Sequence, residues 1–410
     1  GVRRSALISL SNLNDDQMAH AKSGMWWENE GQRALANNSV AYKEKPQMGT
    51  FMREWMSLYD SKSGERGIFN RQSAKKQAAK NGRRDTEHDF GCNPCSEIIL
   101  RPYQFCNLSE VVVRASDTQQ SLINKVRLAT ILGTFQATLT DFKYLRKIWK
   151  NNTEEERLLG VSLTGIMDNA MMSNTAGNDK ITLNAILDAL KQEAIKTNAE
   201  FSKKIGINQS AAITCVKPSG TVSQLVDSAS GIHARHNPYY IRTVRGDNKD
   251  PLTQFMKAQG IPAEPDVMKP DSTTVFSFPM KSPKSAITRN DMSAIEQLEL
   301  WLTYQLHWCE HKPSVTISVK EHEWMEVGAW VYEHFDNVSG ISFLPHSEHT
   351  YQQAPYQDID EEQYKKFLTQ MPDSVDWSLL PEFEKEDTTS GGRELACTAG
   401  VCEVVDLTAA

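Results

Sequence analysis

Residues 211–223 read Ala-Ala-Ile-Thr-Cys-Val-Lys-Pro-Ser-Gly-Thr-Val-Ser, a stretch that changes from apolar to small polar residues halfway along. Its first part, Ala211–Val216, predicts a buried strand, and Pro218–Ser223 predicts a turn from which a helix starts. A strand that passes through a short turn into a helix is a building unit of α/β domains. The stretch therefore points to an α/β fold if the same alternation recurs along the chain.

The alternation does recur on both sides of this stretch. Apolar residues at helical spacing predict helices over 119–150 and 181–204. Further helices are predicted at 293–311, 321–336 and 360–370. The strands predicted in the same half of the chain are Tyr239–Val244, Val275–Phe278, Val315–Val319 and Ile341–Leu344. Strands that alternate with helices of this length favour an α/β architecture with much parallel pairing.

The composition limits the classes of protein to consider. The chain has 410 residues, a net charge of -7, 39% hydrophobic and 24% charged residues, which is typical of a soluble globular protein. Its negative charge argues against a broad surface for nucleic acid or membrane lipid. No run approaches the roughly 20 apolar residues that a membrane-spanning helix needs. We therefore expect a cytoplasmic protein with no nucleic-acid or membrane partner.

The two ends of the sequence differ in character. The chain opens on residues 1–10 without an initiator Met, and the apolar run there predicts a strand, so we expect a piece of a longer polypeptide. From about residue 383 the sequence is polar, with too few apolar residues to order itself. We expect one large domain over 1–382 and a flexible tail over 383–410.

The cysteines are too few for a disulfide-built secreted scaffold, but their grouping is informative. Cys92, Cys95 and Cys106 form one group, and Cys397 and Cys402 form a pair in the predicted tail. In a reducing compartment, such groups usually bind a metal ion or carry out redox chemistry.

The densest run of reactive side chains is Cys92-Asn93-Pro94-Cys95-Ser96-Glu97. In an extended backbone alternate side chains point the same way, so Asn93, Cys95 and Glu97 would face one small molecule. An amide, a thiol and a carboxylate in that arrangement suit acid–base catalysis beside a sulfur-centred step.

Two other interpretations of these cysteines remain open. Cys92 and Cys95 with Cys397 and Cys402 could supply four thiolates to a structural zinc ion, or Cys92 and Cys95 could form a thioredoxin-like pair. The second pair is spaced more widely than usual zinc ligands and lies on the tail, and the βαβ context of a thioredoxin is missing. We therefore favour redox or radical use over zinc.

The small polar residues after Lys217 raise a further possibility. Backbone N–H groups at the start of a helix, together with Ser and Thr hydroxyls, form an anion site. An isolated Ser-Gly-Thr is more often an ordinary helix cap. The residues concerned are Pro218, Ser219, Gly220, Thr221, Val222 and Ser223.

The string Asn-Pro-Cys-x-Glu at 93–97 resembles the finger-loop signature of ribonucleotide reductases. The resemblance implies that Cys95 becomes a thiyl radical that abstracts the 3′ hydrogen of the ribose. It implies that Asn93 and Glu97 hold the substrate hydroxyls, with Glu97 as general base, and that Cys106 delivers reducing equivalents. Cys397 and Cys402 would then re-reduce the active-site disulfide and would themselves be reduced by thioredoxin or a similar dithiol. Cys92 has no role in this scheme.

A second match does not depend on cysteine. Residues 217–223 resemble the loop that cradles the substrate phosphates in this family, and both Pro-Ser-Gly-Thr and residues 231–242 are similar to class II members. The resemblance implies an adenosylcobalamin-dependent, allosteric triphosphate reductase whose fold is the C-terminal part of a ten-stranded α/β barrel. The early barrel strands and the redox partner of Cys106 would lie upstream, on an N-terminal part that is missing here.

Two alternatives to this assignment stay open. One is a class I large subunit, which takes its radical from a separate metal-containing subunit. The other is a non-catalytic fragment that binds zinc or a nucleotide. Cys215 and Cys309 are interpreted as structural thiols in each case, and Tyr239-Tyr240 as a packed pair in a strand.

Overall fold

The computed structural model describes residues 7–24, 26, 31–33, 36–175, 180–346 and 352–385. These residues divide into two compact units. The larger unit contains the described residues from 7 to 234 together with 285–346, and the smaller unit contains 235–284 together with 352–385. Cys397 and Cys402 lie outside the described residues, so the predicted boundary at 382/383 and the tail remain predictions.

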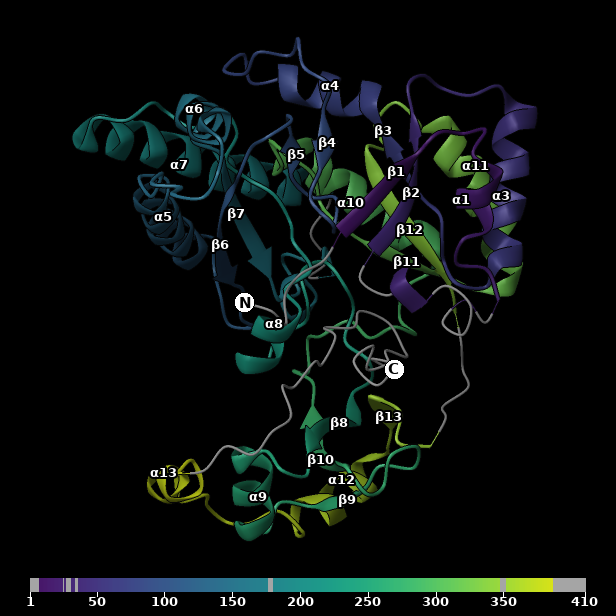
Figure 1. The fold of residues 1–410 in the computed structure, drawn as a ribbon, viewed down its shortest axis with the longest axis vertical. Coiled ribbons are helices and arrows are strands. Elements are labelled where there is room, and N and C mark those ends of the chain that lie inside the picture. Colours follow the sequence, from purple (N-terminus) through teal and green to yellow (C-terminus); the bar gives the residue numbers. More distant parts are fainter. Residues whose placement is uncertain are drawn as a thin grey trace. The chain divides into compact units, whose positions relative to one another are not determined.

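The larger unit contains a sheet built from both ends of its sequence (Figure 1). Strands β1 (Leu7–Ser11), β2 (Ala36–Tyr42) and β3 (Gly67–Asn70) are parallel to one another. Strand β12 (Gly340–Pro345) pairs antiparallel with β3, and β11 (Thr316–Val319) pairs parallel with β12. The predicted strands 315–319 and 341–344 are thus confirmed to within a residue.

A second row of extended segments joins the same unit. Strand β6 (Asn107–Val112) is parallel to β7 (Leu159–Thr164), Val161 of β7 forms a parallel bridge with Thr214, and Val216 does so with Pro313. Pro313 lies just before β11, so the row leads into the first sheet. The predicted strand 211–216 is therefore present only as two isolated bridges, but its direction is the parallel one expected.

Helices cover these strands as the α/β pattern predicts. They are α1 (Asp16–His20), α3 (Met48–Ser61), α4 (Arg71–Ala79), α5 (Gln119–Gln136), α6 (Lys147–Glu156), α7 (Lys180–Ile205), α8 (Thr221–Leu225), α10 (Ala294–His307) and α11 (Trp324–Glu333). The helical region predicted over 119–150 consists of two helices, α5 and α6. Helix α5 starts at a capping box formed by Thr118 and Ser121. Just after its C-terminal end, the Thr138 hydroxyl donates a hydrogen bond to Phe135 O at 2.8 Å.

The core of the larger unit is organised by aromatic residues of α10. Trp301, Tyr304 and Trp308 are fully buried, and each directs its polar atom to a backbone carbonyl. Trp301 Nε1 donates to Pro313 O at 2.9 Å, and Trp308 Nε1 donates to Cys215 O at 2.7 Å. Large apolar side chains with a satisfied polar atom fix both position and orientation. Helix α10 thereby holds in place the two segments on either side of the parallel bridge.

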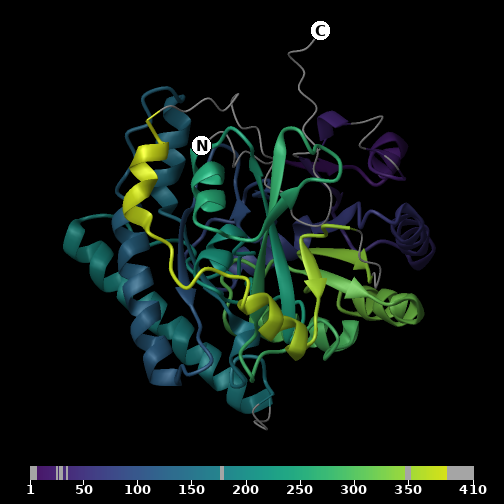
Figure 2. The same ribbon diagram turned by 90° about the horizontal axis from the view of Figure 1, so that it is seen from below.

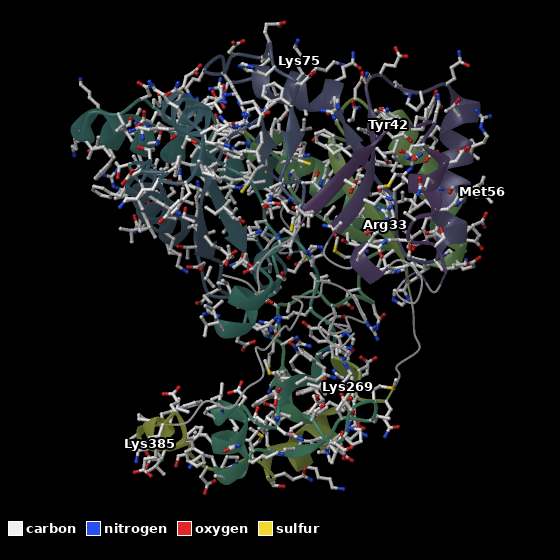
Figure 3. The ribbon with its side chains drawn as sticks, in the orientation of Figure 1. Arg33, Tyr42, Met56, Lys75, Lys269 and Lys385 are labelled. Carbon is white, nitrogen blue, oxygen red and sulfur yellow. The ribbon has the colours of Figure 1, made fainter. Side chains whose placement is uncertain are left out.

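The side chains of the larger unit separate by polarity as expected for a globular protein. Figure 3 shows Tyr42 within this unit, and Lys75 and Met56 at its margin. Tyr42 is 4% exposed, whereas Met56 is 45% exposed. Across the described part of the chain, no helix is long and apolar enough to cross a lipid bilayer.

The smaller unit is an antiparallel sheet with short helices. Its strands β8 (Tyr239–Asp247), β9 (Ala263–Pro265), β10 (Thr273–Lys281) and β13 (Tyr356–Asp358) lie in the order β13-β8-β10-β9. Its helices are α9 (Pro251–Ala258), α12 (Glu361–Leu368) and α13 (Leu380–Phe383). Helix α12 packs on β8 and β10 (Figures 1 and 2). Tyr239–Val244 and Val275–Phe278 are strands as predicted, and Tyr239 packs against Tyr364.

Candidate functional site

The Cys92–Glu97 run lies at a hairpin. Strand β4 (Gly91–Cys92) pairs antiparallel with β5 (Ile99–Leu100), so residues 93–98 form the β4–β5 loop. Asn93 organises this loop through three contacts. Its backbone oxygen accepts from the Ser96 N–H at 2.8 Å, its Oδ1 accepts from the Ile98 N–H at 2.9 Å, and its Nδ2 donates to Glu97 Oε1 at 2.7 Å.

The prediction that Asn93 and Glu97 lie close together is correct, but the backbone conformation predicted for it is not the one observed. We predicted an extended backbone with alternate side chains on one side. The loop instead turns at Ser96, which has a left-handed φ of 66°, and the Asn93 amide reaches Glu97 across that turn. The two residues do come together, because a hairpin with an Asn side chain bonded to its own backbone is a compact alternative to a strand.

Glu97 is the most enclosed residue of the loop. It is 0% exposed, its Oε1 accepts from Asn93, and Lys217 Nζ lies 3.3 Å from the same oxygen. Its Oε2 is buried and has no hydrogen-bond partner among the residues that the structure describes. A buried carboxylate oxygen without a donor is costly and is rare in native proteins.

Cys95 sits in the loop next to this carboxylate and is partly exposed. Burial of the thiol and the negative charge of Glu97 raise its pKa, and Lys217 opposes the shift. The sulfur consequently keeps its proton at neutral pH. Nucleophilic and metal-binding cysteines need the thiolate, whereas a protonated thiol can give up a hydrogen atom.

Cys106 precedes β6 and belongs to the same electrostatic neighbourhood. Burial raises the pKa of its thiol, Glu97 raises it further, and Arg84 and Lys217 act in the opposite direction. Cys95 and Cys106 thus both feel the same carboxylate, that of Glu97, and the same ammonium, that of Lys217. The structure therefore brings together the four residues predicted from this part of the sequence.

A buried ion pair holds the segment that leads to Cys106. Arg84 donates from Nε and from Nη2 to the two oxygens of Glu156, both at 3.0 Å. The Gln104 side chain also bonds to Glu156 and accepts from Arg84 Nη2 at 3.3 Å. Bidentate pairs of this kind fix geometry as well as charge. Gln104 is two residues before Cys106, so the pair limits where that thiol can lie.

Two lysines that the sequence analysis did not single out complete the site, Lys217 partly exposed and Lys312 buried. Burial opposes the charge of Lys217, but the ion pair with Glu97 outweighs it and raises the pKa of the ammonium. Lys312 is 0% exposed and donates to Ser96 Oγ at 2.9 Å. Each lysine lies at an end of a predicted strand, Lys217 directly after Val216 and Lys312 shortly before Val315. A cation at the end of an apolar strand was the signal that could have found them.

His311 links the β4–β5 hairpin to the neighbouring strand β7. Its Nδ1 accepts from the Ile99 N–H at 3.3 Å, and its Nε2 lies 2.9 Å from Leu159 O. Burial lowers the pKa of this imidazole to about 3. A neutral ring that accepts at Nδ1 and donates at Nε2 satisfies both contacts, and it ties β5 to β7.

The predicted phosphate loop adjoins Glu97 through Lys217. The helix expected after the turn is α8, and it starts at Thr221, inside the predicted turn. Ser219 Oγ donates to Glu110 Oε1 at 2.7 Å, and the N–H groups of Ser219 and Gly220 point to Ser230 Oγ at 3.1 and 3.4 Å. These contacts tie the segment to β6 and to Ser230.

The remaining cysteines fit a packing role. Cys215 and Cys309 are buried, as predicted for structural thiols. Cys92 packs beside the cluster that contains Phe69 and Phe90, and burial raises the pKa of its thiol. Within the described ranges, no group of three or more His, Cys, Asp or Glu side chains is arranged to hold a metal ion. The zinc hypothesis invokes Cys397 and Cys402, which lie outside those ranges.

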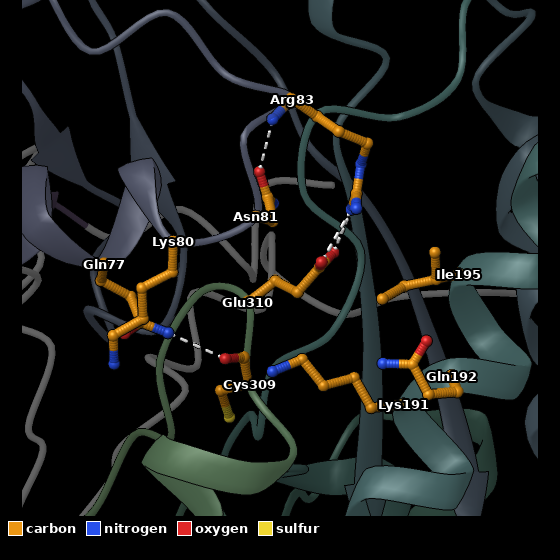
Figure 4. Close-up of a pocket in the computed structure, with 9 residues that line it drawn as sticks. All are labelled: Gln77, Lys80, Asn81, Arg83, Lys191, Gln192, Ile195, Cys309 and Glu310. Atoms are coloured by element: carbon orange, nitrogen blue, oxygen red, sulfur yellow. Dashed lines mark hydrogen bonds and ion pairs between the residues drawn. The ribbon is translucent and has the colours of Figure 1, made fainter.

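A separate pocket of about 350 Å³ lies away from the predicted residues (Figure 4). It is lined by Gln77, Lys80, Asn81, Arg83, Lys191, Gln192, Ile195, Cys309 and Glu310. Arg83 Nη2 bonds both oxygens of Glu310 at 2.7 and 2.6 Å, so the carboxylate in this pocket is already paired. We place the candidate site at the β4–β5 loop, because the buried carboxylate of Glu97 lies in this loop and acts on the thiols of both Cys95 and Cys106.

Comparison with known proteins finds relatives over almost the whole chain. No family model matches the chain. The adenosylcobalamin-dependent ribonucleoside-triphosphate reductases of Lactobacillus delbrueckii subsp. bulgaricus and Lactobacillus leichmannii are each 28% identical over 98% of this chain and 57% of their own length. The enzyme of the same description from Levilactobacillus brevis is 26% identical over 88% of this chain and 51% of its own length. The chain thus spans little more than half of the relatives it matches.

Solved structures show the same relationship. A B12-dependent, class II ribonucleotide reductase superposes with a TM-score of 0.72 and 25% identity, over 92% of this chain and 55% of that one. The α subunit of a class Id ribonucleotide reductase from Actinobacillus ureae gives a TM-score of 0.55 over 83% of this chain and 70% of that one, at 13% identity, which shows the shared fold alone. The predicted α/β class is confirmed. Over almost its whole length the chain is similar to adenosylcobalamin-dependent, class II ribonucleotide reductases.

Proposed function

We propose that this chain is the catalytic part of an enzyme that reduces ribonucleotides to 2′-deoxyribonucleotides for DNA synthesis. The observation that carries the proposal is the arrangement in the β4–β5 loop. A protonated thiol at Cys95 adjoins a buried carboxylate, Glu97, one oxygen of which is held by Asn93 and Lys217 while the other has no partner in the described part of the chain. That free oxygen suits the 3′-hydroxyl of a ribose.

Three residues divide the reaction at the ribose between them. Cys95, once its sulfur has lost a hydrogen atom, takes the hydrogen from C3′. Glu97 Oε2 accepts the proton of the 3′-hydroxyl, which helps the neighbouring C2′–O bond to break, with the 2′-hydroxyl leaving as water. Asn93 holds Glu97 and keeps its Oε1 occupied, so the free oxygen is the one that faces substrate.

The overall change needs two electrons and two protons from a pair of thiols, which become a disulfide. Cys106 is proposed as one thiol of this pair, and the second would come from a further polypeptide segment, the N-terminal part named above. Cys397 and Cys402 are proposed to reduce the resulting disulfide, and thioredoxin or a similar dithiol to reduce them in turn. These thiols work in a reducing compartment, so we place the enzyme in the cytoplasm.

The substrate phosphates are proposed to bind at residues 218–223. The segment starts next to Lys217, whose side chain is 31% exposed and whose ammonium contacts Glu97. One end of this segment therefore lies at the proposed ribose position, as a nucleotide would require. The relatives are named as triphosphate reductases, and we propose a triphosphate substrate here as well.

Adenosylcobalamin is the proposed cofactor. When bound, it supplies the homolysis that removes a hydrogen atom from a thiol. The fit between this chain and the cofactor rests on Cys95, which offers that hydrogen because burial and Glu97 keep the thiol protonated. The loop contacts of Asn93 and Lys312 hold this thiol in place, and its partial exposure leaves it accessible.

The test is deoxyribonucleotide formation by the full-length protein that contains this chain. We expect product from ribonucleoside triphosphates and a dithiol only when adenosylcobalamin is added. Product that forms without it, and only with a separate metal-containing subunit, would favour the class I alternative. No product under either condition, with stoichiometric zinc that is lost on Cys397→Ser, would favour the non-catalytic alternative.

A further inference from the structure

Lys312 carries a charge where packing alone would favour an apolar residue. Its side chain lies wholly inside the larger unit, where Nζ donates to Ser96 Oγ at 2.9 Å and to Ser339 O at 3.1 Å and lies 4.6 Å from the centre of the Phe69 ring. Moving an ammonium out of water costs free energy that these contacts only partly offset. A methionine of similar volume would avoid that cost, so the ammonium is expected to have a structural role at this position.

The lysine holds the β4–β5 loop at two consecutive residues. Its Nζ bonds Ser96, and its backbone N–H donates to Glu97 O at 3.0 Å. Ser96 lies between Cys95 and Glu97 and has a left-handed φ of 66°, a conformation that a serine keeps when its surroundings impose it. The bond to Lys312 is a side-chain contact that anchors this residue in that conformation.

Strand β12 closes the space around the contact. A Cβ at Gly340 would lie 2.2 Å from Ser96 Oγ and 2.6 Å from Lys312 Nζ, so a larger residue here would displace one or both of these side chains. The preceding residue of the same strand end, Ser339, gives the ammonium its second acceptor. The end of β12 is thus shaped around the meeting of Ser96 and Lys312.

We infer that Lys312 is a positioning residue of this site, which acts through Ser96 to fix the directions of the Cys95 thiol and the Glu97 carboxylate. Lys312 itself does not contact substrate. Its effect on the loop stands on the contacts alone, whereas its effect on turnover rests on the proposed function.

The test compares Lys312→Met, Ser96→Ala and the double variant in the full-length protein. The readouts are hydrogen–deuterium exchange of peptides that contain residues 93–98 and the alkylation rate of Cys95. A hydrogen bond to a charged group holds a segment by enough to slow its opening on the order of tenfold or more. We expect each single variant to raise both the exchange rate and the alkylation rate by about that factor. The double variant should show the same rates as the single variants, because both changes remove the same Ser96–Lys312 contact. Lys76→Met, at a half-exposed lysine of α4, is the matched control.

Measurements of kcat and KM distinguish a positioning role of Lys312 from a role in the stability of the fold alone. We expect kcat of Lys312→Met to fall on the order of 10²-fold through misplacement of the reacting groups, with KM for the nucleotide unchanged. Ser96→Ala keeps the lysine in place and tests the same contact if Lys312→Met does not fold. Exchange and alkylation equal to the wild type, or additive effects in the double variant, would overturn the inference. Failure of the proposed function would appear differently, as product formed by a variant that lacks Cys95.

Discussion

Cys95→Ser is expected to reduce deoxyribonucleotide formation by the full-length protein on the order of 10³-fold or more, because loss of a residue that carries the covalent or radical step is among the largest single effects in enzymes. A serine hydroxyl holds its hydrogen far more tightly than a thiol, so it cannot pass a hydrogen atom to and from the ribose. The change removes one sulfur and adds an oxygen in a partly exposed loop, so folding should be preserved.

Nucleotide binding and a second thiol provide the controls for this variant. We expect the Kd for the nucleotide to stay within a few-fold of the wild type, because Asn93, Glu97 and residues 218–223 are untouched. Cys309→Ala removes a buried thiol outside the site and should keep turnover. Turnover retained by Cys95→Ser would show that the sulfur at position 95 does not react.

Glu97→Gln is expected to lower kcat by about 10²- to 10⁴-fold, the usual contribution of a general acid–base residue. Glutamine has the same shape and keeps an oxygen for Asn93, but its amide cannot take the proton of the 3′-hydroxyl. It also leaves Lys217 without its counter-charge, since that ammonium lies 3.3 Å from Glu97 Oε1.

Steady-state kinetics would check this second expectation. The loss should appear in kcat, with KM changed much less, because the free Oε2 is used in the reaction and the phosphates bind elsewhere. The comparison variant is Glu155→Gln, which removes a carboxylate that is 60% exposed and pairs with Arg101. A Glu97→Gln protein with the kcat of the Glu155→Gln protein would remove Glu97 from the mechanism.

Much of the fold followed from the sequence because its strands and helices are marked by strong local patterns. The buried strands near 315–319 and 341–344 and the helices α5, α7 and α10 stand out by apolar spacing and caps. Strand order could not be predicted in this way. The pairing of β12 with β3 joins residues far apart in the chain, and it depends on packing that no local pattern records.

The residues of the site also differ in whether the local sequence marks them. Asn93, Cys95, Glu97 and Cys106 could be found because they are close in sequence and chemically distinctive. The lysines that surround them were missed, because Lys217 and Lys312 enter from distant segments and only their places at the ends of apolar strands mark them. The turn at Ser96 was missed for a related reason. Its left-handed backbone is stabilised by Lys312 and by the glycine at position 340, neither of which is near it in the chain.

The fate of the hydrogen at C3′ tests the central claim most directly. Full-length protein would be given a ribonucleoside triphosphate carrying deuterium at C3′, with adenosylcobalamin and a dithiol, and product formation would be followed in a single turnover. Cleavage of that bond by the sulfur at position 95 predicts slower product formation than with the unlabelled nucleotide. Equal rates for the two nucleotides would contradict the claim that this sulfur opens the reaction at the ribose.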